Sequence, residues 1–218
     1  MKEIKICWLF NDLLDLYGDS GNLRILEYYL KEKEIPYSIT EKGLYDEICF
    51  TDYDFVYCGP GKLKNLKEAA KRLNQKKESL MEAIEKEVFF LFSGSSCILL
   101  GKELKDAKGE VTPCVGLFDY SATDQDKVMI EDVFTTLPFS DRKVYGFINR
   151  TAALDNENEQ SRKEGFIYKN VFASWLLGPL LVKNPDLLAY YFKKLTGTEL
   201  DLSNTLEEKA YRETMKEL

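Results

Sequence analysis

Apolar residues in this chain are gathered into short runs that alternate with longer, charged segments. Runs of strand character lie at residues 5–10, 37–40, 53–58 and 88–92. Residues 23–31 and 62–86 lie between them and place leucine and alanine at helical spacing among charged residues. The resulting order, strand–helix–strand–strand–helix–strand, predicts an α/β fold with a largely parallel central sheet flanked by helices.

The second half of the chain is richer in strand patterns. We expect strands at residues 115–118, 128–134, 144–147 and 166–171. The polar segment 155–164 is predicted to be an exposed loop or hairpin tip, and Asn184 and Pro185 begin a further helix. Residues 1–200 are expected to form a single domain, followed by a charged C-terminal helix or tail over 201–218.

The charge of the chain narrows the classes of partner. It has 218 residues and a net charge of −7, and an acidic surface repels phosphate backbones, so nucleic-acid binding is not expected. The N-terminal residues run straight into a strand pattern and lack a signal-peptide core. No apolar run approaches the roughly 18 residues needed to span a bilayer. We therefore expect a cytoplasmic protein without a membrane span.

The chain contains no histidine. Imidazole is the usual general base near neutral pH, so neither a Cys–His nor a Ser–His–Asp site can be assembled from this chain. Its five cysteines show no CxxC spacing and do not supply a tetrahedral set for zinc. We expect no metal site and no cofactor.

The turn after the strand at 88–92 is the place where chemistry would be expected. Residues 93–96, SGSS, would lift Ser93 above the carboxyl edge of the sheet, where backbone N–H groups can stabilise an oxyanion. Other interpretations remain open. Ser93 could simply cap the following helix. Cys97, one helical turn later, could be a nucleophile with a pKa lowered by the helix N-terminus, or a buried helix residue.

Several segments resemble one family of enzymes. Residues 16–22 (LYGDSGN), 57–61 (YCGPG), 90–94 (FLFSG), 116–119 (GLFD), 146–150 (GFINR) and 176–185 (LLGPLLVKNP) carry the resemblance. In order and spacing they are similar to the motifs of class I glutamine amidotransferases of the cobyric acid synthase type. Within that family they resemble in particular the amidotransferase subunit of lipid II isoglutaminyl synthase. The resemblance implies a flavodoxin-like amidotransferase fold.

The resemblance also implies a partner and a set of site positions. The partner would be a Mur-ligase-like subunit that uses ammonia released from glutamine to amidate a peptidoglycan precursor. The family's catalytic cysteine maps to Ser93 and its histidine to Leu177, with about one extra residue between Ser93 and Gly101. Substrate-binding positions carried over from the family motifs are Gly59, Pro60, Gly61, Gly94, Asn149 and Arg150.

Three functions follow from these substitutions. The first is a catalytically inactive amidotransferase-like subunit that acts as a partner or regulator of a Mur-ligase-like enzyme. The second is an active glutaminase subunit with Cys97 or Ser93 as a non-standard nucleophile and lysine or tyrosine as the base. The third is a module that binds glutamine or another small molecule without hydrolysing it.

Overall fold

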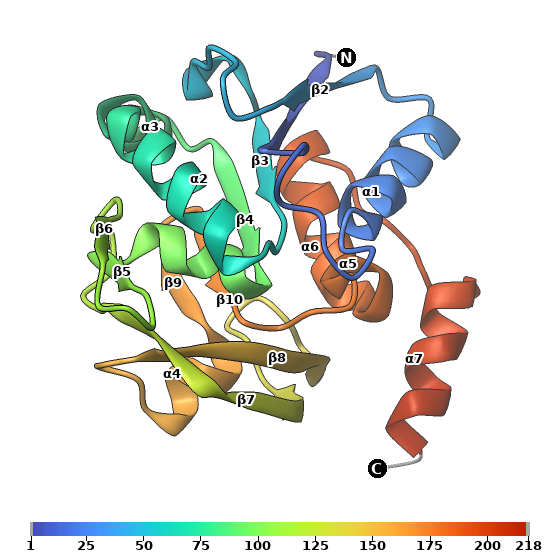
Figure 1. The fold of residues 1–218 in the computed structure, drawn as a ribbon. Helices are drawn as coiled ribbons and strands as arrows, with labels where there is room; N and C mark the ends of the chain where they lie inside the picture. Colours follow the sequence, from blue (N-terminus) through green and yellow to red (C-terminus); the bar gives the residue numbers. More distant parts are fainter. Residues whose placement is uncertain (1, 217–218) are drawn as a thin grey trace.

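The computed structural model describes residues 2–216, and these build a six-stranded central sheet with the strand order β2-β1-β3-β4-β10-β9 (Figure 1). Five strands run parallel, and β9 pairs antiparallel with β10 at one edge. The α/β fold and the largely parallel sheet expected from the sequence are confirmed. The strands are β1 (Ile4–Leu9), β2 (Tyr37–Lys42), β3 (Phe55–Cys58), β4 (Phe89–Ser93), β9 (Phe166–Tyr168) and β10 (Val171–Ser174).

Helices cover both faces of the central sheet (Figure 1). On one face lie α2 (Leu63–Gln75) and α3 (Lys77–Glu85), the two helices into which the predicted helical segment 62–86 divides. On the other face lie α1 (Gly21–Glu32), α5 (Leu180–Lys183) and α6 (Pro185–Thr196). The spacing of Leu66, Ala69, Ala70 and Leu73 places all four on the buried side of α2. Because helices cover both faces, the inner strand β3 is buried at every residue.

A smaller four-stranded sheet, with the order β6-β5-β7-β8, follows β4 in the chain. Its strands are β5 (Glu103–Lys105), β6 (Val111–Pro113), β7 (Ala122–Thr135) and β8 (Val144–Leu154). The two sheets are connected through Phe147 of β8, whose carbonyl accepts a hydrogen bond of 2.8 Å from the Leu177 N–H. Figure 1 shows β7 and β8 as long strands crossing below the central sheet.

Two predicted elements differ from the structure. The strand expected at 115–118 is wrong, because Val115 and Leu117 donate their N–H groups to residues 99 and 100 and wrap around the turn after β4. The segment 155–164 contains a short helix, α4 (Glu159–Glu164), rather than only a loop or hairpin tip. A reciprocal capping box between Asn158 and Ser161 begins that helix.

The C-terminal segment ends in α7 (Leu206–Lys216), the charged helix predicted there, while residues 217–218 lie outside the described part of the chain. Arg142 Nη1 lies 2.9 Å from the Glu208 carboxylate, and the Tyr211 hydroxyl donates to the Lys143 carbonyl over 2.6 Å. These contacts hold α7 against the loop that precedes β8. A short 3₁₀ helix, η1, spans Phe50–Asp52. No helix within residues 2–216 is both long enough and apolar enough to cross a membrane.

Candidate functional site

The sharp turn after β4 lies one residue later than expected, at Gly94 instead of Ser93. Strand β4 ends at Ser93, and a short 3₁₀ helix, η2 (Gly94–Leu100), follows directly. Ser93 has an extended backbone with φ −107° and ψ 146°, whereas Gly94 has φ +57°. Gly94 therefore adopts the left-handed conformation that turns the strand sharply into the helix. Glycine adopts this conformation without steric cost. Ser93 is the last strand residue and is not lifted above the sheet edge.

The Ser93 side chain is fully buried in a hydrogen-bonded cluster. Its hydroxyl donates to the Asp19 carboxylate, which also accepts from the Tyr57 hydroxyl at 2.9 Å and from the Gly178 N–H at 3.1 Å. Burial raises the pKa of Asp19, against the lowering effect of these hydrogen bonds. The cluster ties together the loop before α1, strands β3 and β4, and the Leu177–Gly178 segment, so Ser93 acts as a structural link.

Leu177 packs directly against the turn. A Cβ atom built on Gly94 would overlap the Leu177 Cδ2 atom and would lie only 2.9 Å from the Pro60 Cβ. Leu177 is 1% exposed, so its side chain occupies the space that any side chain at position 94 would need. The two positions are complementary in volume, one having no side chain and the other filling the gap.

Cys97 lies on η2 and is fully buried. Burial raises the pKa of its thiol well above the ordinary value, so the nucleophilic thiolate is not formed at neutral pH. The carbonyl of Cys97 accepts a hydrogen bond from the Tyr120 hydroxyl at 2.5 Å, which holds this turn against the segment that precedes β7. The geometry places Cys97 in the core.

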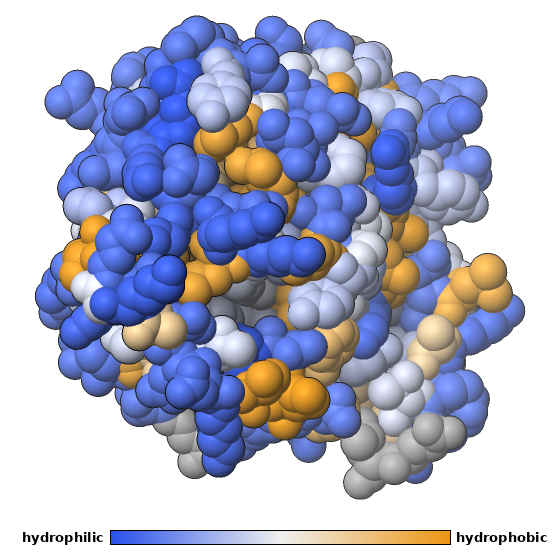
Figure 2. All heavy atoms as spheres, in the orientation of Figure 1, coloured by the Kyte–Doolittle hydropathy of each residue, from blue (hydrophilic) through white to orange (hydrophobic). Residues whose placement is uncertain are grey.

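A cavity of about 290 Å³ opens beside the turn. Figure 2 shows the surface hollowed between α2 and the β7–β8 pair, with hydrophobic residues around the hollow. Of the predicted site residues, Pro60, Gly61, Asn149, Arg150 and Leu177 line it, whereas Gly59, Ser93, Gly94 and Cys97 are not among the lining residues. The other lining residues are Leu16, Tyr17, Lys62, Leu63, Leu66, Ser95, Ile98, Val128, Thr151, Ala152 and Trp175.

Residues 5–185 match the family of CobB/CobQ-like glutamine amidotransferase domains. This chain belongs to that family. Two curated relatives are each named "Lipid II isoglutaminyl synthase (glutamine-hydrolyzing) subunit GatD". The one from Staphylococcus aureus is 28% identical over 206 residues, covering 89% of this chain and 85% of the relative. The one from Streptococcus pneumoniae is 27% identical over 220 residues, covering 92% and 85%.

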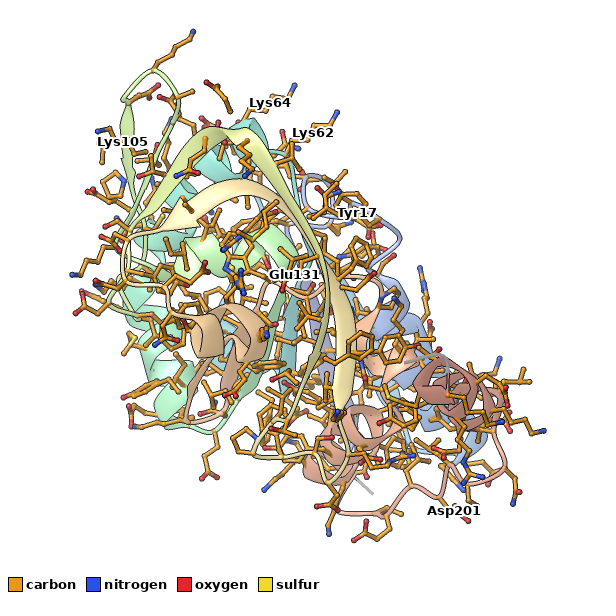
Figure 3. All side chains as sticks on the ribbon, turned by 90° about the horizontal axis from the view of Figure 1, so that it is seen from below. Tyr17, Lys62, Lys64, Lys105, Glu131 and Asp201 are labelled. Atoms are coloured by element: carbon orange, nitrogen blue, oxygen red, sulfur yellow. The ribbon has the colours of Figure 1, made fainter. Side chains whose placement is uncertain are left out.

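In this CobB/CobQ-like domain the buried cation that lines the cavity, Arg150, forms an ion pair with Glu157, which lies outside the lining. Arg150 Nη1 lies 2.7 Å from a Glu157 carboxylate oxygen, and its guanidinium stacks 4.2 Å above the Trp175 ring. The Arg150 side chain is only 2% exposed. Arg150 therefore serves mainly as a packed ion pair in the cavity floor, which leaves Lys62 at the mouth as an exposed cation. Figure 3 shows Lys62 and Lys64 extending outward from the protein near Tyr17.

The sequence patterns did not indicate the aliphatic wall of the cavity. Leu63 and Leu66 are spaced as core residues of α2, and Ile98 reads as part of an apolar helix start. Nothing in their local pattern separates a residue that faces a cavity from one that faces the core. Tyr17 carried a clearer sequence signal, since it lies inside the LYGDSGN motif. In the structure it adopts an unusual left-handed φ of 64°.

Proposed function

We propose that this chain is an amidotransferase-like subunit without glutaminase activity that associates with a Mur-ligase-like enzyme in the amidation of cell-wall precursors. The two relatives, whose printed names make them subunits of a glutamine-hydrolysing synthase, support the subunit role. Their matches cover about nine-tenths of this chain, which supports assigning the subunit role to the whole domain. The loss of hydrolysis is inferred from the site itself.

The observation that carries the proposal is the pairing of Gly94 with Leu177. Gly94 adopts the left-handed turn, and aligning it with the family's cysteine removes the extra residue otherwise needed before Gly101. We infer that the nucleophile position is occupied by Gly94, which has no side chain, rather than by Ser93. Leu177, at the histidine position, fills the vacated space. The cysteine thiolate and the histidine imidazole of the family are thus both absent, and Gly94 and Leu177 pack against each other in their place.

This replacement removes the route to the covalent intermediate. Amide hydrolysis in such enzymes begins with attack by an activated thiolate, and glycine offers no atom that can attack. The nearby hydroxyl of Ser93 donates to Asp19 within the core, and Ser93 does not line the cavity. Losing nucleophile and base together typically lowers kcat by several orders of magnitude.

The retained cavity supports a second candidate function, the binding of glutamine or another small molecule without turnover. The cavity is open and lined by both polar and apolar residues, so it is not simply closed by the substitutions. Isothermal titration with glutamine tests this candidate directly. Heat of binding without glutamate release would support it, and no heat at millimolar glutamine would reject it.

The principal test is a glutaminase assay on the purified chain, alone and together with a Mur-ligase-like protein from the same genome. We expect glutamate release at the level of buffer in both cases. Turnover that disappears in Ser93→Ala or Cys97→Ala would show a working nucleophile and refute the proposal of inactivity.

The partner role needs its own test. Co-expression followed by size-exclusion chromatography should recover a stable complex with the Mur-ligase-like protein. Separate elution of the two proteins at micromolar concentration would refute the partnership without bearing on glutaminase activity.

A further inference from the structure

The cavity beside the Gly94 turn has a largely aliphatic wall. Its volume of about 290 Å³ is close to the lower end of the range for small-molecule sites, which starts at roughly 300 Å³. Such a wall suits the apolar body of a small ligand. The aliphatic lining residues are Leu16, Leu63, Leu66, Ile98, Val128, Ala152 and Leu177.

The charge around this cavity has one sign. Lys62 lines the cavity, is exposed at its mouth (Figure 3) and forms no salt bridge with any residue the structure describes. No aspartate or glutamate of the described chain is among the lining residues. Arg150 is paired with Glu157, which lies outside the lining. The cavity therefore favours an anionic ligand group and offers no carboxylate to a cationic one.

Two buried donors among the lining residues lack an acceptor. Trp175 is 1% and Arg150 is 5% exposed, and within residues 2–216 neither the Trp175 Nε1–H nor the Arg150 Nε–H has a hydrogen-bond partner. An unpartnered buried donor costs free energy that an acceptor would recover. An ammonium group carries only donors and cannot act as that acceptor. These groups add to the preference of the cavity for acceptors.

Helix α2 begins at this cavity. Gly61, Lys62 and Leu63 all line it, and Leu63 is the first helical residue. The first N–H groups of a helix have no acceptor inside the helix, and for Leu63 and Lys64 none is found elsewhere in the described chain. No side chain caps this end, and its first turn contains no acidic residue. Open N–H groups at the positive end of a helix dipole attract a carboxylate.

We propose that the cavity binds a small carboxylate that has an apolar body and no ammonium group. The carboxylate lies at the start of α2, against the Leu63 and Lys64 N–H groups and the Lys62 side chain. The apolar body lies against Leu66 and Ile98. Glutamine fits this site less well, because its ammonium group meets no carboxylate there. The inference rests on the second candidate function and deepens it, since it names the class of small molecule that the retained cavity takes.

The test is isothermal titration of the full chain with compounds of matched shape. In the first series, 4-methylpentanoate carries the carboxylate, leucine adds an α-ammonium group, and 4-methylpentanamide has no charge. A second series with a larger body consists of 3-phenylpropanoate, phenylalanine and 3-phenylpropanamide. In at least one series the carboxylate should bind about tenfold or more tightly than both the amino acid and the amide. Glutamine should bind more weakly than that carboxylate.

One pair of variants tests the start of α2. Leu63→Pro removes the Leu63 N–H at the first helical residue, where proline is tolerated. Lys62 already has φ −69° and ψ 150°, the extended backbone that a residue before proline adopts. Leu63→Ala is the matched control, because it loses the leucine side chain but keeps the N–H. The proline variant should bind the carboxylate about fivefold or more weakly than the alanine variant.

A second pair of variants tests the charge at the mouth. Lys62→Met removes the charge but keeps most of the side-chain length, and it should weaken carboxylate binding about threefold or more. Lys77→Met is the control for net charge, because Lys77 is also exposed but lies on α3 and does not line the cavity. It should bind as wild type does.

Three outcomes would overturn the inference. They are no binding of either carboxylate at millimolar concentration, an amino acid or glutamine that binds as tightly as the carboxylates, and equal affinities of the Leu63→Pro and Leu63→Ala variants. Glutamine as the tightest ligand would overturn the inference and still support the second candidate function. None of these results would bear on the glutaminase assay or on recovery of the complex with the Mur-ligase-like protein.

Discussion

The complementarity of Gly94 and Leu177 predicts a specific energetic coupling between two residues far apart in the sequence. In Gly94→Ala, the new Cβ overlaps Leu177 Cδ2 and lies 2.9 Å from Pro60 Cβ and 3.2 Å from Leu177 Cγ. Overpacking of this kind costs about 1–3 kcal/mol. The left-handed φ of +57° adds about 1–2 kcal/mol for a residue with a Cβ. We expect the variant to lose about 2–5 kcal/mol of its free energy of unfolding.

The matched second variant is Leu177→Ala, which removes the branch that blocks position 94. Alone it should cost about 2–5 kcal/mol, because it leaves a cavity in the core. In the double variant, the alanine Cβ at 94 enters part of that cavity and the overlap disappears. The double variant should therefore be more stable than the sum of the single effects by about 1–3 kcal/mol.

The assay is urea unfolding followed by tryptophan fluorescence, with the slope of the transition checked for constancy across the variants. Gly197→Ala is the control for backbone strain alone, since Gly197 has φ +72° and no heavy atom lies within 4 Å of a Cβ built there. It should cost about 1–2 kcal/mol and show no coupling to Leu177→Ala. Additive effects of Gly94→Ala and Leu177→Ala, within about 0.5 kcal/mol, would refute the packing argument.

Three further predictions concern buried polar groups. Asp19→Ala should destabilise the chain by about 2 kcal/mol or more in urea unfolding, because the buried Gly178 N–H loses its acceptor and the Ser93 and Tyr57 hydroxyls each lose their bond to the carboxylate; an effect below about 1 kcal/mol would contradict the structural role of the cluster. The Arg142 hydrogen bond lowers the pKa of Glu208 in the folded state, so this pair stabilises the fold above the unfolded value of 4.5, and that stabilisation is lost as the pH falls through the folded pKa. The Tm difference between wild type and Glu208→Gln should therefore shrink on acidification, and a difference independent of pH would exclude this linkage. Arg150→Met should cost about 3–5 kcal/mol by stranding the Glu157 carboxylate, and most of that loss should be recovered in the double variant with Glu157→Gln; thermal unfolding of both variants measures it.

The alternation of apolar runs with charged helical segments was enough to predict the parallel sheet and the helices over 62–86. These patterns are local, because a strand buried on both faces must be apolar throughout and a helix on its surface must be apolar on one side. The strand expected at 115–118 failed because its N–H groups bond to residues of η2, a pairing that no local pattern reveals. The cavity wall was missed for a similar reason, since Leu63 and Ile98 look like any other core residues.

The sequence by itself determined the family and the absence of an imidazole base, because motifs and residue counts do not depend on how the chain folds. Only the tertiary structure decided that the sharp turn falls on Gly94 rather than on Ser93, since a run of small residues permits more than one backbone path. It also brought together groups distant in the chain: Ser93 bonds to Asp19, 74 residues away, and Leu177 fills the space beside Gly94. Such contacts depend on where the backbone places each side chain, which residue types alone do not specify.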